Sequence, residues 1–122
     1  MNIKQFYIDI HGNYDDALSI MMSDSLIERM LAKFINNNLY EQIISSYENK
    51  DYRSLFAASH SFKGVTGNLA LTPLYEISCI IVEATRNSDD VNIDKEIEVL
   101  KKEYQLVKDS YFKNIDCYSG NK

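Results

Sequence analysis

Tryptophan is absent from the 122 residues, and glycine and proline are scarce, with four Gly and one Pro. So few turn formers leave little room for a chain of short strands and tight hairpins. Cysteine is equally rare, and Cys79 and Cys117 form no Cys-x-x-Cys pair and have no metal-ligand spacing. We therefore expect reduced thiols rather than a disulfide framework, and neither a zinc site nor another metal centre.

Positive charge and long apolar runs are also lacking. Thirteen Lys and Arg face eighteen Asp and Glu, giving a net charge of -5 and a pI of about 4.9. This balance disfavours nucleic acid and anionic membrane surfaces as partners, whereas a protein with a basic patch is compatible with it. Residues 1–12 do not form a signal peptide, and no run approaches the ~18 apolar residues of a membrane span. We expect a cytoplasmic, single-domain protein.

Apolar residues recur at helical spacing along most of the chain, and alternating strand patterns are nearly absent. We predict an all-α fold, an antiparallel up-down four-helix bundle with a short N-terminal helix capping one end. The predicted segments are a lead-in over 1–12, a short helix over 13–21, a long helical stretch over 23–50 weakened at 36–38, helices over 51–69, 73–86 and 93–114, and a flexible tail over 116–122. The bundle domain is residues 13–115.

Helix starts are marked by residues that cap helices well. Asn13, Ser23 or Asp24, and Asp51 each precede an apolar periodic run. Thr72-Pro73 predicts a further start, with Thr72 as the N-cap and Pro73 in the first turn.

One predicted helix, residues 51–69, has an unusual face. It contains Gly64 and Gly67, although each glycine costs about 1 kcal/mol relative to alanine inside a helix. At about 100° per residue, both glycines lie within about 40° of His60. Arg53 and Phe56 also lie within about 40° of it, and Ala57 and Lys63 about 60° away. The opposite side carries the apolar residues Leu55, Ala58, Phe62, Val65 and Leu69.

His60 is therefore expected on the surface, with small residues that let a broad partner approach its imidazole. A neutral imidazole nitrogen is a good nucleophile near neutral pH, and a phosphoryl group on it retains high transfer potential. Lys63, one turn further on, can neutralise the added charge of about -1.5 to -2. The pattern predicts a phosphoryl-accepting histidine.

A surface histidine on a helix is, however, usually incidental. Two helix-weakening glycines on the same face favour the functional interpretation. Phe56 keeps two interpretations, a contact at the rim of a docking surface or a partly buried packing residue. His11 neighbours a glycine but lacks a lysine-glycine context, so we interpret it as structural or incidental.

Residues 58–69, ASHSFKGVTGNL, resemble the signature of histidine-containing phosphotransfer (HPt) domains, whose core pattern is His-x-x-Lys-Gly. The likeness extends over 13–34, the helix start at Asp51 and residues 71–86, and so covers nearly the whole chain except about eight residues at each end. One departure is Ala70, where many members have glycine, and we expect it to affect the helix end rather than the chemistry.

The resemblance implies a phosphorelay intermediate of two-component signalling. His60 corresponds to the phosphorylated histidine, Lys63 to the lysine that contacts the phosphoryl group, and Gly64 to the glycine that leaves room for it. The implied partners are a response-regulator receiver domain and a hybrid sensor kinase, with Mg²⁺ held by the receiver and no cofactor on this chain. We expect a monomeric phosphocarrier rather than an enzyme, because no glycine-rich nucleotide loop is present.

Two alternatives stay open at this point. The chain could be a helical adaptor that binds a receiver or kinase domain without phosphorylation, although such a protein would need neither His60 nor Lys63. It could also be the phosphoacceptor and dimerisation part of a sensor kinase, which would need an ATP-binding domain.

Overall fold

The computed structural model describes residues 1–87 and 91–119, with side chains up to Ile115. All regular secondary structure within these ranges is α-helical, as predicted. None of the described helices is long and apolar enough to cross a membrane. The elements are α1 (Ile3–Asp9), α2 (Tyr14–Met21), α3 (Asp24–Asn36), α4 (Leu39–Glu48), α5 (Tyr52–Asn68), α6 (Thr72–Thr85) and α7 (Asp94–Ser119).

Short polar side chains begin three of these helices, as predicted. The side-chain oxygens of Asn13, Ser23 and Asp51 each accept a hydrogen bond from a backbone N–H three residues on. The prediction for Thr72 was wrong: α6 already begins at this residue, and its hydroxyl donates to the carbonyl of Ala70 instead. Pro73 lies in the first turn, where its missing N–H has no cost.

The long stretch predicted over 23–50 is two helices, α3 and α4. Its break falls at the predicted weak point, where Asn37 has an extended backbone and its side chain accepts from the N–H of Leu39. Helix α7 continues to Ser119, beyond the predicted end at Asn114. Residues 120–122 of the predicted tail lie outside the described residues, as do residues 88–90 of the loop before α7.

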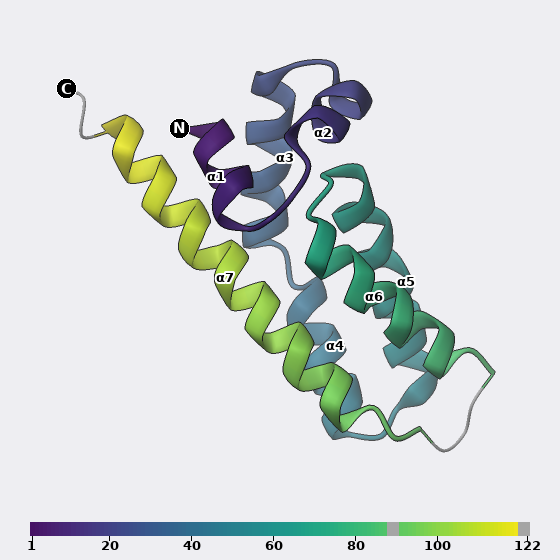
Figure 1. Ribbon diagram of the computed structural model, residues 1–122. Helices are drawn as coiled ribbons and strands as arrows, with labels where there is room; N and C mark the ends of the chain where they lie inside the picture. The colour runs from purple at the N-terminus through teal and green to yellow at the C-terminus, as the bar shows by residue number, and fades with distance from the viewer. Residues whose placement is uncertain (88–90, 120–122) are drawn as a thin grey trace.

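Helix α5 lies between α4 and α6, and α7 packs along α6 (Figure 1). The face of α5 predicted to be apolar points inward, where Phe62 meets Phe34 and Tyr104 at ring-centroid distances of 5.4 and 6.3 Å. Tyr40 of α4 stacks on Tyr104 at 3.9 Å. This aromatic group joins α3, α4, α5 and α7 in one core, and it fixes which face of α5 remains outside.

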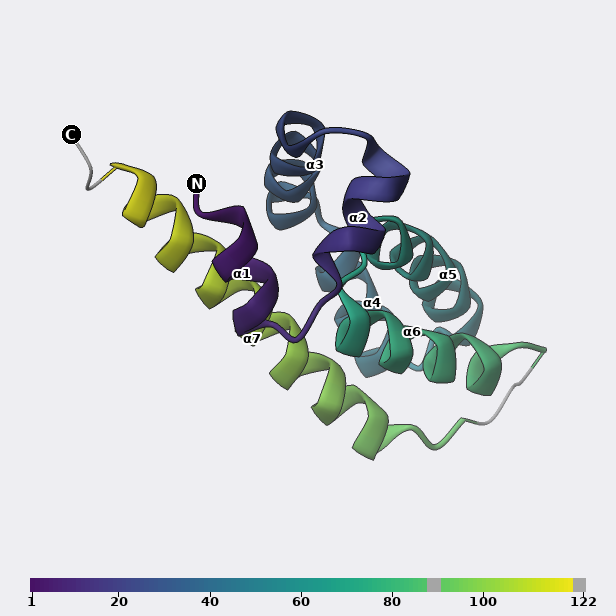
Figure 2. The same ribbon diagram turned by 45° about the horizontal axis from the view of Figure 1, so that its top comes forward.

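The lead-in over residues 1–12 contains helix α1, which lies beside the C-terminal half of α7 (Figures 1 and 2). Phe6, Tyr7 and Ile10 are buried in the core. The backbone N–H of Asn2 donates to the carbonyl of Asn114 at 3.2 Å, which joins the start of the chain to α7. Residues 3–10 are thus part of the packed structure.

The end of α5 is held by α1. The Tyr7 hydroxyl, almost fully buried, donates to the Leu69 carbonyl at 2.6 Å. Ala70 has a left-handed backbone (φ 51°), and its N–H and that of Leu71 donate to the carbonyls of Gly67 and Thr66. This is a Schellman ending, and the left-handed position favours glycine. The departure at Ala70 therefore falls at a strained helix end, as we expected.

Replacing Tyr7 by phenylalanine should lower the free energy of unfolding by about 1–3 kcal/mol, because a buried carbonyl would lose its donor. Tyr14→Phe is the matched control, since the Tyr14 hydroxyl donates to Asp24 in an exposed position. Chemical denaturation of both variants checks the difference. An equal cost for the two substitutions would contradict it.

The Tyr7 hydroxyl also makes the free energy of unfolding depend on pH. Burial, followed by the charge of Tyr14, raises the pKa of Tyr7 well above its usual value of 10. The folded protein therefore keeps the proton more tightly than the unfolded chain does, so this contribution is complete below pH 10 and declines as the pH rises above it. Tyr7→Phe should accordingly lose less stability than the wild type between neutral and strongly alkaline pH.

Candidate functional site

Helix α5 presents His60 on the side opposite the core. Leu55, Phe62 and Leu69 are fully buried, whereas His60 is exposed. The helical period alone dictates this arrangement, because the apolar side must pack on α4 and α6.

One aromatic ring lies next to the imidazole, and a cation lies against that ring. Phe56, one turn before His60, is half-buried, with its ring centroid 5.8 Å from that of His60. Arg86 directly follows α6, and its guanidinium lies over the Phe56 ring at 5.3 Å from the centroid and pairs with Glu83 at 3.1 Å. Phe56 is therefore a partly buried packing residue, and its contact at the rim of a docking surface stays a prediction.

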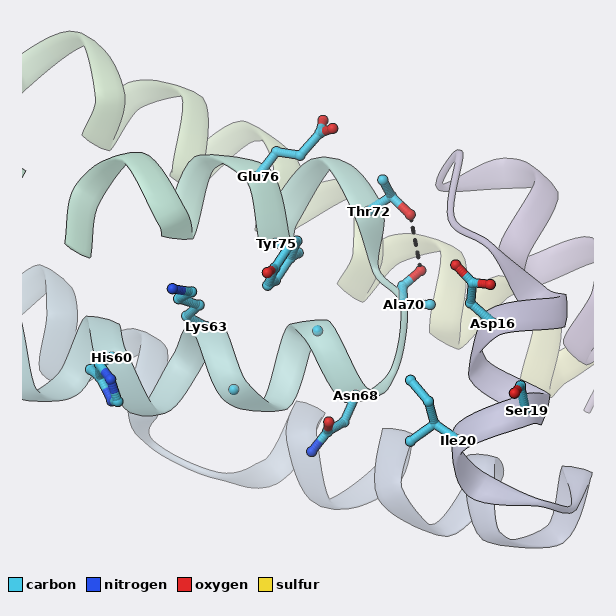
Figure 3. A pocket seen from close by; sticks show the side chains of 12 residues that line it. Asp16, Ser19, Ile20, His60, Lys63, Asn68, Ala70, Thr72, Tyr75 and Glu76 are labelled. Atoms are coloured by element: carbon cyan, nitrogen blue, oxygen red, sulfur yellow. Dashed lines mark hydrogen bonds between the residues drawn. The ribbon is translucent and has the colours of Figure 1, made fainter. Parts of the chain in front are cut away.

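Lys63 is half-buried and reaches toward α6, while His60 points away from α5 (Figure 3). The pKa of Glu83 lies below its usual value because of its hydrogen bond and charge interaction with Arg86, with a smaller contribution from Lys63. The ammonium group of Lys63 thus lies within electrostatic reach of a carboxylate on α6. An anion on His60 would compete with Glu83 for it.

A groove of about 660 Å³ opens beside the two residues, between α5, α6 and α2 (Figure 3). It brings together His60, Lys63, Gly64 and Gly67 of the predicted site. Sequence reasoning did not assign the other lining residues to the site: Asp16, Ser19 and Ile20 of α2, Asn68 of α5, Ala70 just after α5, and Thr72, Tyr75 and Glu76 of α6.

The remaining predicted residues lie elsewhere on α5. Arg53 and Phe56 line a second hollow, of about 720 Å³, with Lys50, Asp51, Tyr52, Thr85, Arg86 and Asn87. Ala57 is exposed and lines neither hollow. The predicted site residues therefore lie along one face of α5 that borders two separate depressions. His60 lines the first and Phe56 the second, and the two side chains are adjacent.

The two glycines of α5 differ in what surrounds them. A Cβ at Gly64 would meet nothing within 4 Å, so the site is open there. A Cβ at Gly67 would lie 3.0 and 3.1 Å from two ring carbons of Tyr75. The predicted access role thus fits Gly64, whereas Gly67 makes room for a tyrosine of the same chain.

Gly64→Ala should raise the free energy of unfolding by about 1 kcal/mol, because alanine is the better helix former and the space is open. Gly67→Ala should raise the free energy of unfolding by less than Gly64→Ala does, because the Tyr75 ring must shift. Urea denaturation of both variants measures the difference. In a Tyr75→Ala background the two substitutions should give equal gains; a persisting difference would show that another contact limits Gly67.

No group of three or more His, Cys, Asp or Glu that could hold a metal ion occurs among the described residues. A scan against protein-family models finds no match, and searches of curated proteins and solved structures find no significant relative.

Proposed function

We propose that the protein is a phosphocarrier of the HPt type, an intermediate of a two-component phosphorelay in which His60 takes a phosphoryl group from a receiver-domain aspartate and passes it to another receiver. The observation that carries the proposal is the arrangement on α5. An exposed imidazole, a lysine one turn away and an open glycine position share a groove. The His-x-x-Lys-Gly resemblance supports the same assignment.

The proposed architecture follows from the same resemblance. The stretch α3–α4, together with α5, α6 and α7, would form the antiparallel up-down four-helix bundle of this family, with α2 over one end. The aromatic contacts between α3, α4, α5 and α7 and the packing of α5 on α6 support this arrangement. Such a bundle holds the acceptor on a regular helix rather than on a loop.

In the proposed reaction, the lone pair of the neutral His60 Nε2 attacks the phosphorus of the aspartyl phosphate in line. The P–N bond forms as the P–O bond to the aspartate breaks, and the carboxylate leaves with the electron pair. The phosphoryl group passes through a loose, metaphosphate-like transition state, and the product imidazole then releases a proton. Reversal of the same steps returns the phosphoryl group to a second receiver.

Lys63 has an electrostatic role in this scheme. Its ammonium group can turn from Glu83 toward the phosphoryl oxygens, which carry more charge than a single carboxylate. Gly64 leaves the space that the phosphoryl group and the partner's backbone need. In this scheme the receiver would hold Mg²⁺ and this chain no cofactor. The proposal also includes a cytoplasmic, monomeric carrier without autokinase activity, as the resemblance implies.

The test is to incubate the protein with a receiver domain phosphorylated by a small-molecule donor, and separately with phosphoramidate, which phosphorylates imidazoles directly. We expect a single phosphoryl group that is labile in acid and stable in base, on the tryptic peptide that contains His60. Absence of such label with both donors would favour the adaptor alternative. Label from ATP alone would favour the sensor-kinase alternative.

A further inference from the structure

The second hollow, formed where α5 begins and α6 ends, has a charge opposite to that of the whole chain. Among its described lining residues, Lys50, Arg53 and Arg86 supply three cations and Asp51 supplies one carboxylate. Asp51 is already engaged, because it caps α5 by accepting from the N–H of Ser54. The described lining residues therefore carry a net charge of +2, or +1 when Glu83, which pairs with Arg86 at 3.1 Å, is counted with them, although the protein as a whole carries -5.

The groove on the other side of His60 has the reverse polarity. Asp16 and Glu76 contribute two carboxylates to its lining, against the single ammonium of Lys63. Phe56 separates the basic hollow from His60, which itself lines the acidic groove. The acceptor thus lies at the boundary between a basic and an acidic depression on one face of the molecule.

We infer that Lys50, Arg53 and Arg86 form a docking surface for an acidic segment of the protein that exchanges phosphoryl groups with His60. This inference rests on the proposed function. Complementary charges accelerate encounter and disfavour wrong orientations. When the partner lies over Phe56 and His60 in one orientation, its acidic segment faces the basic hollow. When the partner is rotated by 180°, the same segment faces the carboxylates of Asp16 and Glu76.

The geometry suits such a contact. Lys50 and Arg53 are exposed, and the Arg86 guanidinium is fixed over the Phe56 ring. Arg53 lies two helical turns before His60, about 10 Å along the axis, so an acidic segment there belongs to the same interface as the reacting group. The hollow sets the direction of approach and takes no part in the chemistry.

The first arm of the test needs no phosphorylation. Titrate the ¹⁵N-labelled protein with a deca-glutamate peptide at low salt and follow amide shifts. We expect changes at residues 50–56 and 85–87, weakened at least about threefold in Lys50→Asn/Arg53→Gln. Asparagine suits the left-handed backbone of Lys50 (φ 56°). The control Lys33→Gln/Lys102→Gln makes the same change, from -5 to -7, at exposed residues outside both hollows.

The second arm measures phosphoryl transfer from a phosphorylated receiver. The hollow variant should be slowed about tenfold at low salt, and less at high salt, whereas the control should not. Labelling by phosphoramidate should be unchanged in both variants. Equal slowing of hollow and control variants, or peptide shifts spread evenly over the molecule, would overturn the inference. If His60 accepts no label at all, the proposed function fails, and the peptide titration alone decides whether the hollow binds acidic segments.

Discussion

Replacing His60 by glutamine should abolish phosphoryl transfer to the protein while leaving its stability within about 0.5 kcal/mol of the wild type. Glutamine has no nucleophilic nitrogen, because its amide lone pair is delocalised. It is similar in size and a better helix former than histidine. His60 is exposed on α5 and faces away from the core, so the substitution would remove the proposed nucleophile without disturbing the core.

The control for this variant is His11→Asn. His11 is the other histidine, is also exposed, and has a left-handed backbone (φ 57°) that asparagine tolerates. We expect full labelling of this variant by a phosphorylated receiver and by phosphoramidate, and background labelling of His60→Gln. Radiolabel counting and intact-mass measurement both report the result. Acid-labile label that persists in His60→Gln would place the acceptor elsewhere.

Replacing Phe62 by alanine should lower the free energy of unfolding by about 3–5 kcal/mol. Phe62 is fully buried and contacts the rings of Phe34 and Tyr104, so its removal leaves a cavity where three helices meet. A domain of this size is stable by about 5–15 kcal/mol, so the loss is a large part of the total. Phe62 lies two residues from His60 on the buried side of α5. The variant therefore tests whether packing of this side keeps the helix that carries His60 in place.

Phe112→Ala provides the comparison, because Phe112 is 48% exposed on α7. Its removal should change the free energy of unfolding by no more than about 0.5 kcal/mol. Urea denaturation followed by far-UV circular dichroism measures both variants. Similar losses for the two phenylalanines would contradict the burial argument and, with it, the orientation of α5.

The helical period was enough to predict which face of α5 is outside. It separated His60 from Leu55, Phe62 and Leu69 because a single amphipathic helix contains that information within itself. The low helix propensity of the asparagine run located the weak point at 36–38, and the capping residue types located the helix starts at Asn13 and Asp51, which are also local properties. Helix α1 could have been found in the same way, because Asn2 caps it and Phe6, Tyr7 and Ile10 have helical spacing.

Contacts between helices could not be predicted from one sequence. Gly67 and Gly64 look alike on a helical wheel, and only the Tyr75 ring of α6 distinguishes them. The same applies to Arg86, which lies 30 positions from Phe56 in the sequence yet covers its ring. The acidic and basic depressions on either side of His60 also depend on how α2 and α6 lie against α5.

Hydrogen bonds hold both ends of α5. Asp51 caps its start, and the Tyr7 hydroxyl donates to the carbonyl of Leu69 just beyond its end. The imidazole therefore sits mid-way along a segment with little freedom to bend or unwind. If this imidazole is the nucleophile we propose, a partner that reaches it would find it already in position, so little conformational entropy would be lost when the two proteins meet. Exchange would then be governed by how often and in which orientation the proteins collide, rather than by any rearrangement within this one.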